Sequence, residues 1–132
     1  MAGPVVVDRE RAQVRQFSHR TGEDTQVLLG VMSMIHQEPL SSAYAKLLNG
    51  KVPDAEATVL AHFFEEVSVL TMHGHVAEDL LYDMFAIDLY WQQMQAQVKA
   101  IRDHSGNQKF GENFEATARA AADYRKALPA KH

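Results

Sequence analysis

Seven apolar residues spaced four and three positions apart constrain the fold of this 132-residue chain more than any other feature. They are Leu80, Met84, Ile87, Trp91, Met94, Val98 and Ile101. This spacing places one apolar stripe along an α-helix. A second apolar face precedes it around Phe63 and Phe64, and Gly74 lies between the two. The pattern predicts a central helical hairpin of about residues 54–73 and 76–103, against which the rest of the chain packs.

Start and stop signals predict further helices on both sides of this hairpin. Pro39 breaks one apolar segment and can begin the next, which Asn49-Gly50 ends. The expected additional helices cover about residues 8–18, 26–36, 40–48 and 108–128. No segment alternates with a period of two residues, so the predicted fold class is all-α. We expect a single-domain bundle of five or six helices over residues 1–132, with residues 1–7 a flexible arm and 129–132 a frayed tail.

The apolar stripe permits two arrangements. Its three heptads are the minimum length for a coiled-coil dimer interface. However, Leu81, Phe85 and Leu89 form a second stripe beside it. A helix that is apolar over such a wide arc is usually central in a globule. The sequence therefore favours packing within one molecule, and it leaves a partial role in dimerisation open.

Composition narrows the class of protein and excludes several kinds of site. The hydrophobic fraction of 46%, the charged fraction of 23% and the formal charge of −4 are typical of a soluble globular protein. The chain contains no cysteine, which excludes disulfides, thiolate metal sites and cysteine nucleophiles. The longest apolar run, residues 27–35, is about half of the ~20 residues that a membrane span needs. With no signal-peptide pattern at the N-terminus, we expect a cytoplasmic protein.

A run of motifs in the predicted hairpin resembles a known family. The motifs are Phe63-Phe64-Glu65-Glu66-Val67, then Gly74 and Val76, then Glu78-Asp79-Leu80 with Tyr82-Asp83-Met84-Phe85, then Tyr90-Trp91 and Ile101-Arg102. In order and spacing this run, covering about residues 59–102, resembles the DUF4760 group of small bacterial helical proteins of unknown function. The resemblance implies an all-α fold. It implies no activity, cofactor or catalytic residue, and some relatives carry a membrane helix ahead of this region.

Four polar residues of the hairpin are candidates for acid–base chemistry. If the hairpin turns at Gly74, antiparallel pairing brings Glu66 level with Asp83, while His62 and Tyr90 lie on the same side. Two close carboxylates raise the pKa of one of them, and a nearby His and Tyr could complete a small catalytic or ligand-binding site. The alternative is that Glu66, Asp83, Tyr90 and His62 are boundary residues, solvated or paired with Arg and Lys.

A His-Gly-His motif suggests a metal site as a second candidate. His73 and His75 could ligate zinc or nickel together with Asp79 or His62. The spacing matches no established motif, because there is neither His-Glu-x-x-His nor the Glu-x-x-His pair of di-iron bundles. A histidine at a helix C-terminus is also favourable through the helix dipole alone. We predict no cofactor.

Basic residues near the N-terminus give a third candidate. They are Arg9, Arg11, Arg15, His19 and Arg20, and Asp8 and Glu10 interleave with them. Such a patch could bind phosphate or nucleic acid, but the chain as a whole is negatively charged and nucleic acid is not the expected partner. The alternative is a solvated helix face.

The preferred functional hypothesis is a non-enzymatic helical module that works through protein–protein contacts, including self-association. It follows from the long apolar helix, the mild charge and the lack of a catalytic motif. The alternative hypothesis is a helical-bundle enzyme or a protein that binds a small molecule. It would use an interior pocket edged by Glu66, Asp83, Tyr90 and His62 and lined by Phe64, Phe85 and Trp91.

Overall fold

A computed structural model of the chain describes residues 22–127. These residues form six helices: α2 (Gly22–Ile35), α3 (Leu40–Leu48), α4 (Asp54–Met72), α5 (Glu78–Met84), α6 (Ile87–Ser105) and α7 (Glu112–Ala127). No strand occurs in this range, which confirms the predicted all-α class. The expected helix at residues 8–18, the arm and the tail lie outside the described residues. Over the described range, no helix is both long and apolar enough to cross a membrane.

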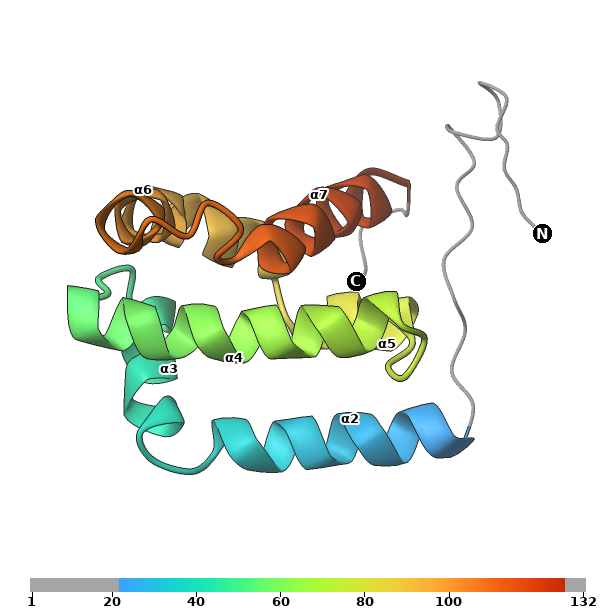
Figure 1. Cartoon of the computed structure of the whole chain (residues 1–132). Helices are drawn as coiled ribbons and strands as arrows, with labels where there is room; N and C mark the ends of the chain where they lie inside the picture. The colour runs from blue at the N-terminus through green and yellow to red at the C-terminus, as the bar shows by residue number, and fades with distance from the viewer. Residues whose placement is uncertain (1–21, 128–132) are drawn as a thin grey trace, which may run out of the picture.

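Helix α4 occupies the middle of the bundle (Figure 1). Helices α6 and α7 lie on one side of it and α2 lies on the other, while α3 and α5 are near its two ends. The predicted first arm of the hairpin, residues 54–73, agrees closely with α4, which begins at Asp54 and ends at Met72. The turn after α4 uses Gly74 with a φ of 82°, a conformation that favours glycine.

The predicted second arm, residues 76–103, is not one helix. It is divided into α5 and α6 because Phe85 adopts an extended conformation, with φ −129° and ψ 131°. The break turns the Phe85 side chain into the core, where it is only 5% exposed. Neither Gly nor Pro marks the position. The available signal was the unbroken apolar run from Met84 to Ile87, which no single helix face can bury.

The apolar stripe is buried within one molecule over most of its length. Ile87, Met94 and Val98 are at most 1% exposed and Trp91 is 9% exposed. On α5 the stripe is less buried, since Met84 is 39% exposed. In the second stripe Leu81 and Phe85 are buried, but Leu89 is 45% exposed. The α6 section of the stripe is therefore occupied by intramolecular packing and does not form a free coiled-coil seam.

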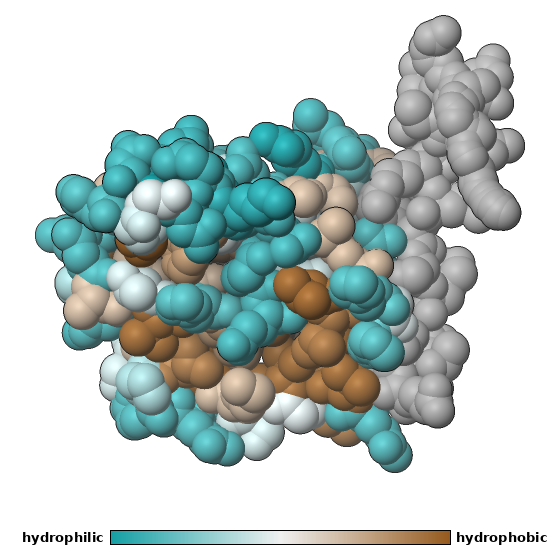
Figure 2. All heavy atoms as spheres, in the orientation of Figure 1, coloured by the Kyte–Doolittle hydropathy of each residue, from teal (hydrophilic) through white to brown (hydrophobic). Residues whose placement is uncertain are grey.

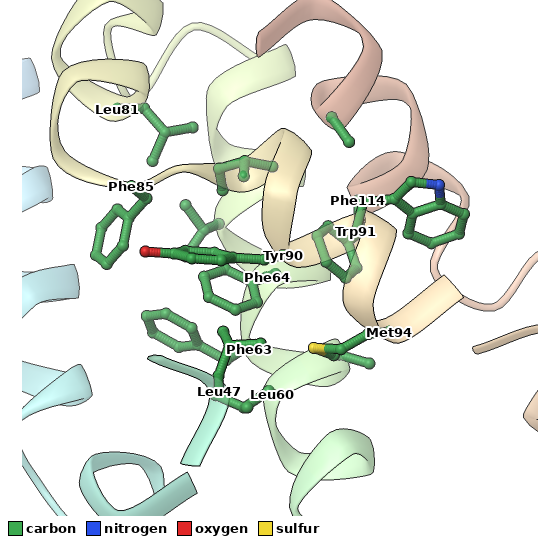
Figure 3. Packing of buried hydrophobic residues seen from close by; sticks show 14 of the residues in the cluster. Leu47, Leu60, Phe63, Phe64, Leu81, Phe85, Tyr90, Trp91, Met94 and Phe114 are labelled. Carbon is green, nitrogen blue, oxygen red and sulfur yellow. The ribbon is translucent and has the colours of Figure 1, made fainter. Parts of the chain in front are cut away.

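Aromatic rings of α4, α6 and α7 meet at the centre of the bundle (Figure 3). Phe64 of α4 lies with its ring centre 5.4 Å from Tyr90 and 5.3 Å from Phe114, and Trp91 packs edge-on against Phe114 at 5.2 Å. Phe64 and Phe114 are fully buried. Burying each ring contributes roughly 1.5–3 kcal/mol, so these contacts dominate the packing of α6 and α7 on α4.

A close turn joins α6 to α7. Gly111 has a φ of 73°, and a Cβ atom added there would lie 2.9 Å from Cγ1 of Val98. Arg102 of α6 holds the same turn, since its Nε donates to the carbonyl oxygen of Phe110 at 2.7 Å and its Nη2 donates to Glu115 at 3.0 Å. The guanidinium also lies 5.8 Å from the centre of the Trp91 ring. The turn therefore fixes α7 against α6 through the close backbone contact at Gly111 and the charged hydrogen bonds of Arg102.

Candidate functional site

The four acid–base candidates lie in three separate places. His62 and Glu66 are exposed on the outer face of α4, one helical turn apart. The His62 ring packs edge-on against Phe110 with 5.1 Å between ring centres. Asp83 is exposed on α5, and Tyr90 is buried in the core. The break at Phe85 explains why Tyr90 does not lie on the same side as Asp83, because that prediction assumed one continuous helix.

Asp83 belongs to a group of polar side chains around α5, which we call the α5 edge: Glu78, Asp79, Tyr82, Asp83 and Tyr124. The Tyr124 hydroxyl donates to Asp83 at 3.2 Å, and the Tyr82 hydroxyl donates to Glu78 at 3.0 Å. The two tyrosine rings lie 5.4 Å apart. Sequence analysis singled out Asp79 and Asp83, and the structure adds the aromatic pair that connects α5 to α7.

The carboxylates of the α5 edge act on the neighbouring Tyr124 of α7. Partial burial, followed by the charge of Asp83 and the hydrogen bond to it, raises the pKa of the Tyr124 hydroxyl above its ordinary value. The charge of Asp79 contributes in the same direction. The Tyr124 hydroxyl therefore stays protonated throughout the physiological pH range and donates its hydrogen bond to Asp83.

Tyr90 is paired with a second tyrosine from α3. The two hydroxyls of Tyr44 and Tyr90 lie 2.8 Å apart. The Tyr44 ring packs edge-on against Tyr90 and Phe85, at 5.8 Å and 6.0 Å between ring centres. Burial, reinforced by the hydrogen bond with Tyr90, raises the pKa of Tyr44 far above its ordinary value. Tyr44 therefore stays neutral, and its hydrogen bond satisfies the hydroxyl group that Tyr90 carries into the core.

The residues proposed for a metal site are spread around the end of α4. His73 and His75 are both exposed, and Asp79 accepts a hydrogen bond from the backbone N–H of Leu80 at 2.8 Å. Among residues 22–127, no three His, Asp or Glu side chains are grouped so that they could hold a metal ion. The His-Gly-His motif follows the helix end, where Gly74 supplies the positive φ.

The carboxylate with the largest structural role is Glu65, which sequence analysis did not single out. Its Oε1 accepts from the backbone N–H groups of Asn113 and Phe114 at 2.9 and 2.8 Å, and its Oε2 accepts from the Asn113 side chain at 2.6 Å. Glu65 thereby caps the N-terminus of α7 from the neighbouring helix α4. The pair Glu65-Glu66 thus divides into an internal cap and an exposed residue, a distinction that depends on where α7 lies.

A second residue that sequence analysis missed is Asp88. It is 7% exposed, and both of its oxygens accept from Arg125 of α7, at 2.7 and 3.0 Å. The hydrogen bonding to Arg125 lowers the pKa of Asp88 below its ordinary value, although burial opposes the shift. A position in the first turn of α6 was the only available signal, and it does not identify the partner.

Apolar side chains remain exposed on helices α2 and α4. Within the described residues, Leu29 and Met34 of α2 are 59% and 47% exposed, and Val69 and Met72 of α4 are 36% and 59% exposed. Figure 2 shows hydrophobic atoms gathered over the face formed by α4 and α2. We call this the α2–α4 face. Helix α2 uses one side to contact the core through Leu28, Val31 and Ile35 and leaves other apolar groups to solvent.

Comparison with known proteins identifies the family. The sequence model of the family described as "Domain of unknown function (DUF4760)" matches residues 11–121. The chain belongs to the DUF4760 family. The match confirms the predicted resemblance and extends it well beyond residues 59–102, to include α2, α3 and most of α7. Comparisons with curated proteins and with solved structures give no match.

Proposed function

We propose that this DUF4760 domain acts through protein–protein contacts, with the α2–α4 face as the contact surface and self-association as its simplest form. The exposed apolar side chains of α2 and α4, with the hydrophobic surface that Figure 2 shows over these two helices, carry the proposal. Exposed apolar groups that gather on one face are typical of interaction sites rather than of monomer surfaces.

The position of α2 supports this choice of surface. Helix α2 covers α4 from one side only and has no further helix of the described chain beyond it (Figure 1). A second apolar face laid against α2 and α4 would complete the burial that the bundle leaves unfinished. At about 25 cal/mol per Å², removing a few hundred Å² of apolar surface from water supplies several kcal/mol toward association.

Sedimentation velocity over a wide concentration series tests the proposal. We expect a sedimentation coefficient that rises with protein concentration in a reversible monomer–oligomer equilibrium. A protein that stays strictly monomeric at all concentrations, and that also retains no partner in affinity capture, would contradict the proposed function.

The alternative hypothesis is small-molecule binding at a site that uses Glu66, Asp83, Tyr90 and His62. It has less support, because these side chains lie on the outer face of α4, on α5 and in the core rather than together. Of the four, Tyr90 is the one placed within the aromatic cluster, where its hydroxyl meets that of Tyr44. A ligand screen by thermal shift, with Tyr44→Phe as the comparison variant, distinguishes this alternative: a ligand that stabilises only the wild-type chain supports it.

A further inference from the structure

Gly30 is an exposed glycine in the interior of helix α2. A glycine inside a helix lowers the equilibrium constant for folding roughly two- to fivefold relative to alanine, because its backbone loses more freedom on folding. Gly50, Gly74, Gly106 and Gly111 each have a positive φ, which favours glycine, whereas Gly30 has the helical conformation of α2. The backbone conformation therefore does not require glycine at position 30.

Crowding within the molecule does not require glycine there either. A Cβ atom added at Gly30 would meet no atom of the described residues within 4 Å. At Gly111, by contrast, an added Cβ atom would lie 2.9 Å from Cγ1 of Val98. Alanine would thus fit at position 30 and would favour the helix. What glycine adds is a bare stretch of backbone, which another backbone can approach more closely than side chains allow.

The surface around Gly30 carries no charge. Residues 25–37 contain no Asp, Glu, Lys or Arg, and this is the longest such run in a chain whose formal charge is −4. Two copies of a negatively charged molecule repel each other least where neither presents charged side chains. Leu29, next to Gly30, is 59% exposed, and Met34, one turn further along α2, is 47% exposed. The bare backbone is therefore flanked by apolar side chains.

A second copy of the chain has the surface that matches this one. In a two-fold dimer the same patch of both molecules meets, so a residue on the axis contacts its own counterpart. Packed helix axes are ordinarily about 8–10 Å apart, and the side chains at the contact set the distance. With glycine on both sides, two α2 helices can cross at the short end of this range while Leu29 and Met34 pack beside the crossing point. No described helix lies beyond α2 to prevent this approach (Figure 1).

We propose that two copies of this chain associate with their α2 helices crossing at Gly30. The inference rests on the proposed function, because it takes self-association at the α2–α4 face and names the contact point within that face. Glycine at this position makes the single molecule less stable and the contact between two molecules closer. Substitutions at Gly30 should therefore change folding stability and association in opposite directions.

Two substitutions at Gly30 test this expectation. In sedimentation velocity, Gly30→Leu should associate at least about tenfold more weakly than the wild type, and Gly30→Ala should show a smaller loss. Gly30→Ala should also raise the denaturant midpoint measured at a concentration where the protein is monomeric, since alanine favours the helix. The matched control is Ala96→Leu, which adds a leucine at an exposed position of α6 and should leave association unchanged.

Disulfide cross-linking locates the contact independently. Because the chain contains no cysteine, a single introduced cysteine forms a disulfide only between two copies. Gly30→Cys should give a cross-linked dimer under mildly oxidising conditions, since a disulfide joins Cα atoms about 4.4–6.8 Å apart. Ala96→Cys, on the exposed side of α6, should remain largely monomeric under the same conditions.

The outcomes separate this inference from the proposed function. A wild-type protein that stays monomeric at all concentrations would contradict both. Association that Gly30→Leu leaves unchanged, with no more cross-linking of Gly30→Cys than of Ala96→Cys, would overturn the crossing at Gly30 alone and leave self-association intact. Equal losses in Gly30→Leu and Ala96→Leu would also overturn it, because the effect would then not be specific to α2.

Discussion

At the scale of single residues, the side chains with identifiable roles are those that connect helices. Glu65 caps α7 from α4, and Asp88 binds Arg125 across the α6–α7 contact. Both are carboxylates whose importance arises from a partner far along the chain. The candidates chosen from local spacing alone, Glu66 and Asp83, are exposed. Proximity in the folded chain, rather than periodicity, decides which acidic residue matters.

Replacing the α7 cap should cost stability. Glu65→Ala removes three accepted hydrogen bonds at the start of α7 and should lower the free energy of unfolding by about 2 kcal/mol. The matched control is Glu66→Ala, one residue along α4 and exposed, which should change it by no more than about 0.5 kcal/mol. Chemical denaturation of both variants measures the difference; equal effects would show that the cap does not form.

The Asp88–Arg125 pair should contribute to acid stability. Because the hydrogen bond from Arg125 lowers the pKa of Asp88 in the folded state, the unfolded chain binds a proton there at higher pH than the folded chain does. The pair therefore contributes its full stabilisation above the pKa that Asp88 has in the unfolded chain, near 4. This stabilisation is lost as the pH falls through the lower pKa of Asp88 in the folded protein. The Asp88→Asn variant should be less stable than the wild type at neutral pH, and it should lose less stability than the wild type on acidification.

Unfolding midpoints measured from neutral pH down to about pH 3 check this expectation. Asp103→Asn makes the same chemical change at an exposed position of α6 and should keep the acid response of the wild type. An Asp88→Asn curve that runs parallel to the wild-type curve would show that the pair is not coupled to folding.

At the scale of elements, the break between α5 and α6 is the feature that organises one end of the bundle. It directs Phe85 onto Tyr44 and Phe64 and sets the α5 edge apart from the axis of α6. Helix periodicity predicted every other boundary of the described helices to within a few residues. It failed here because both halves have helical sequences, and only tertiary burial of Phe85 favours the extended conformation between them.

Substitution at the break distinguishes the two arrangements. Phe85→Ala should lower the free energy of unfolding by about 3–5 kcal/mol, since a nearly buried ring leaves a cavity. Leu89→Ala, on the same predicted stripe but 45% exposed, should cost no more than about 1 kcal/mol. In a continuous helix the two substitutions would instead lower the free energy of unfolding by similar amounts. Thermal or chemical unfolding separates these outcomes.

The α6–α7 turn should tolerate no side chain at Gly111. Gly111→Ala combines a positive φ with a contact of 2.9 Å to Val98 and should destabilise the protein by about 2–4 kcal/mol. Gly50→Ala has a similar φ of 83° but open space around the added methyl group, and should cost only about 1–2 kcal/mol. If the two variants lose the same free energy of unfolding, then Val98 does not restrict the space around Gly111.

At the scale of the whole molecule, the sequence determines the fold class better than it determines the surface. Hydrophobic periodicity identified α4, and most of the α6 stripe is buried as predicted, because burial acts on whole helix faces. Exposed apolar groups such as Leu29 and Met34 could not be predicted in this way, since they share a helix with the core residues Leu28 and Ile35. Whether such a side chain faces the core or solvent depends on the direction of the neighbouring helix.

We propose the α2–α4 face as the contact surface of the molecule. Sedimentation velocity of Leu29→Glu/Val69→Glu beside Leu89→Glu tests this proposal, because Leu89 is also apolar, has an exposed fraction between those of Leu29 and Val69, and lies on α6. We expect the α2–α4 variant to associate at least about tenfold more weakly than the wild type, a change of about 1.4 kcal/mol, and Leu89→Glu to associate like the wild type. Undiminished association of the α2–α4 variant would contradict the claim.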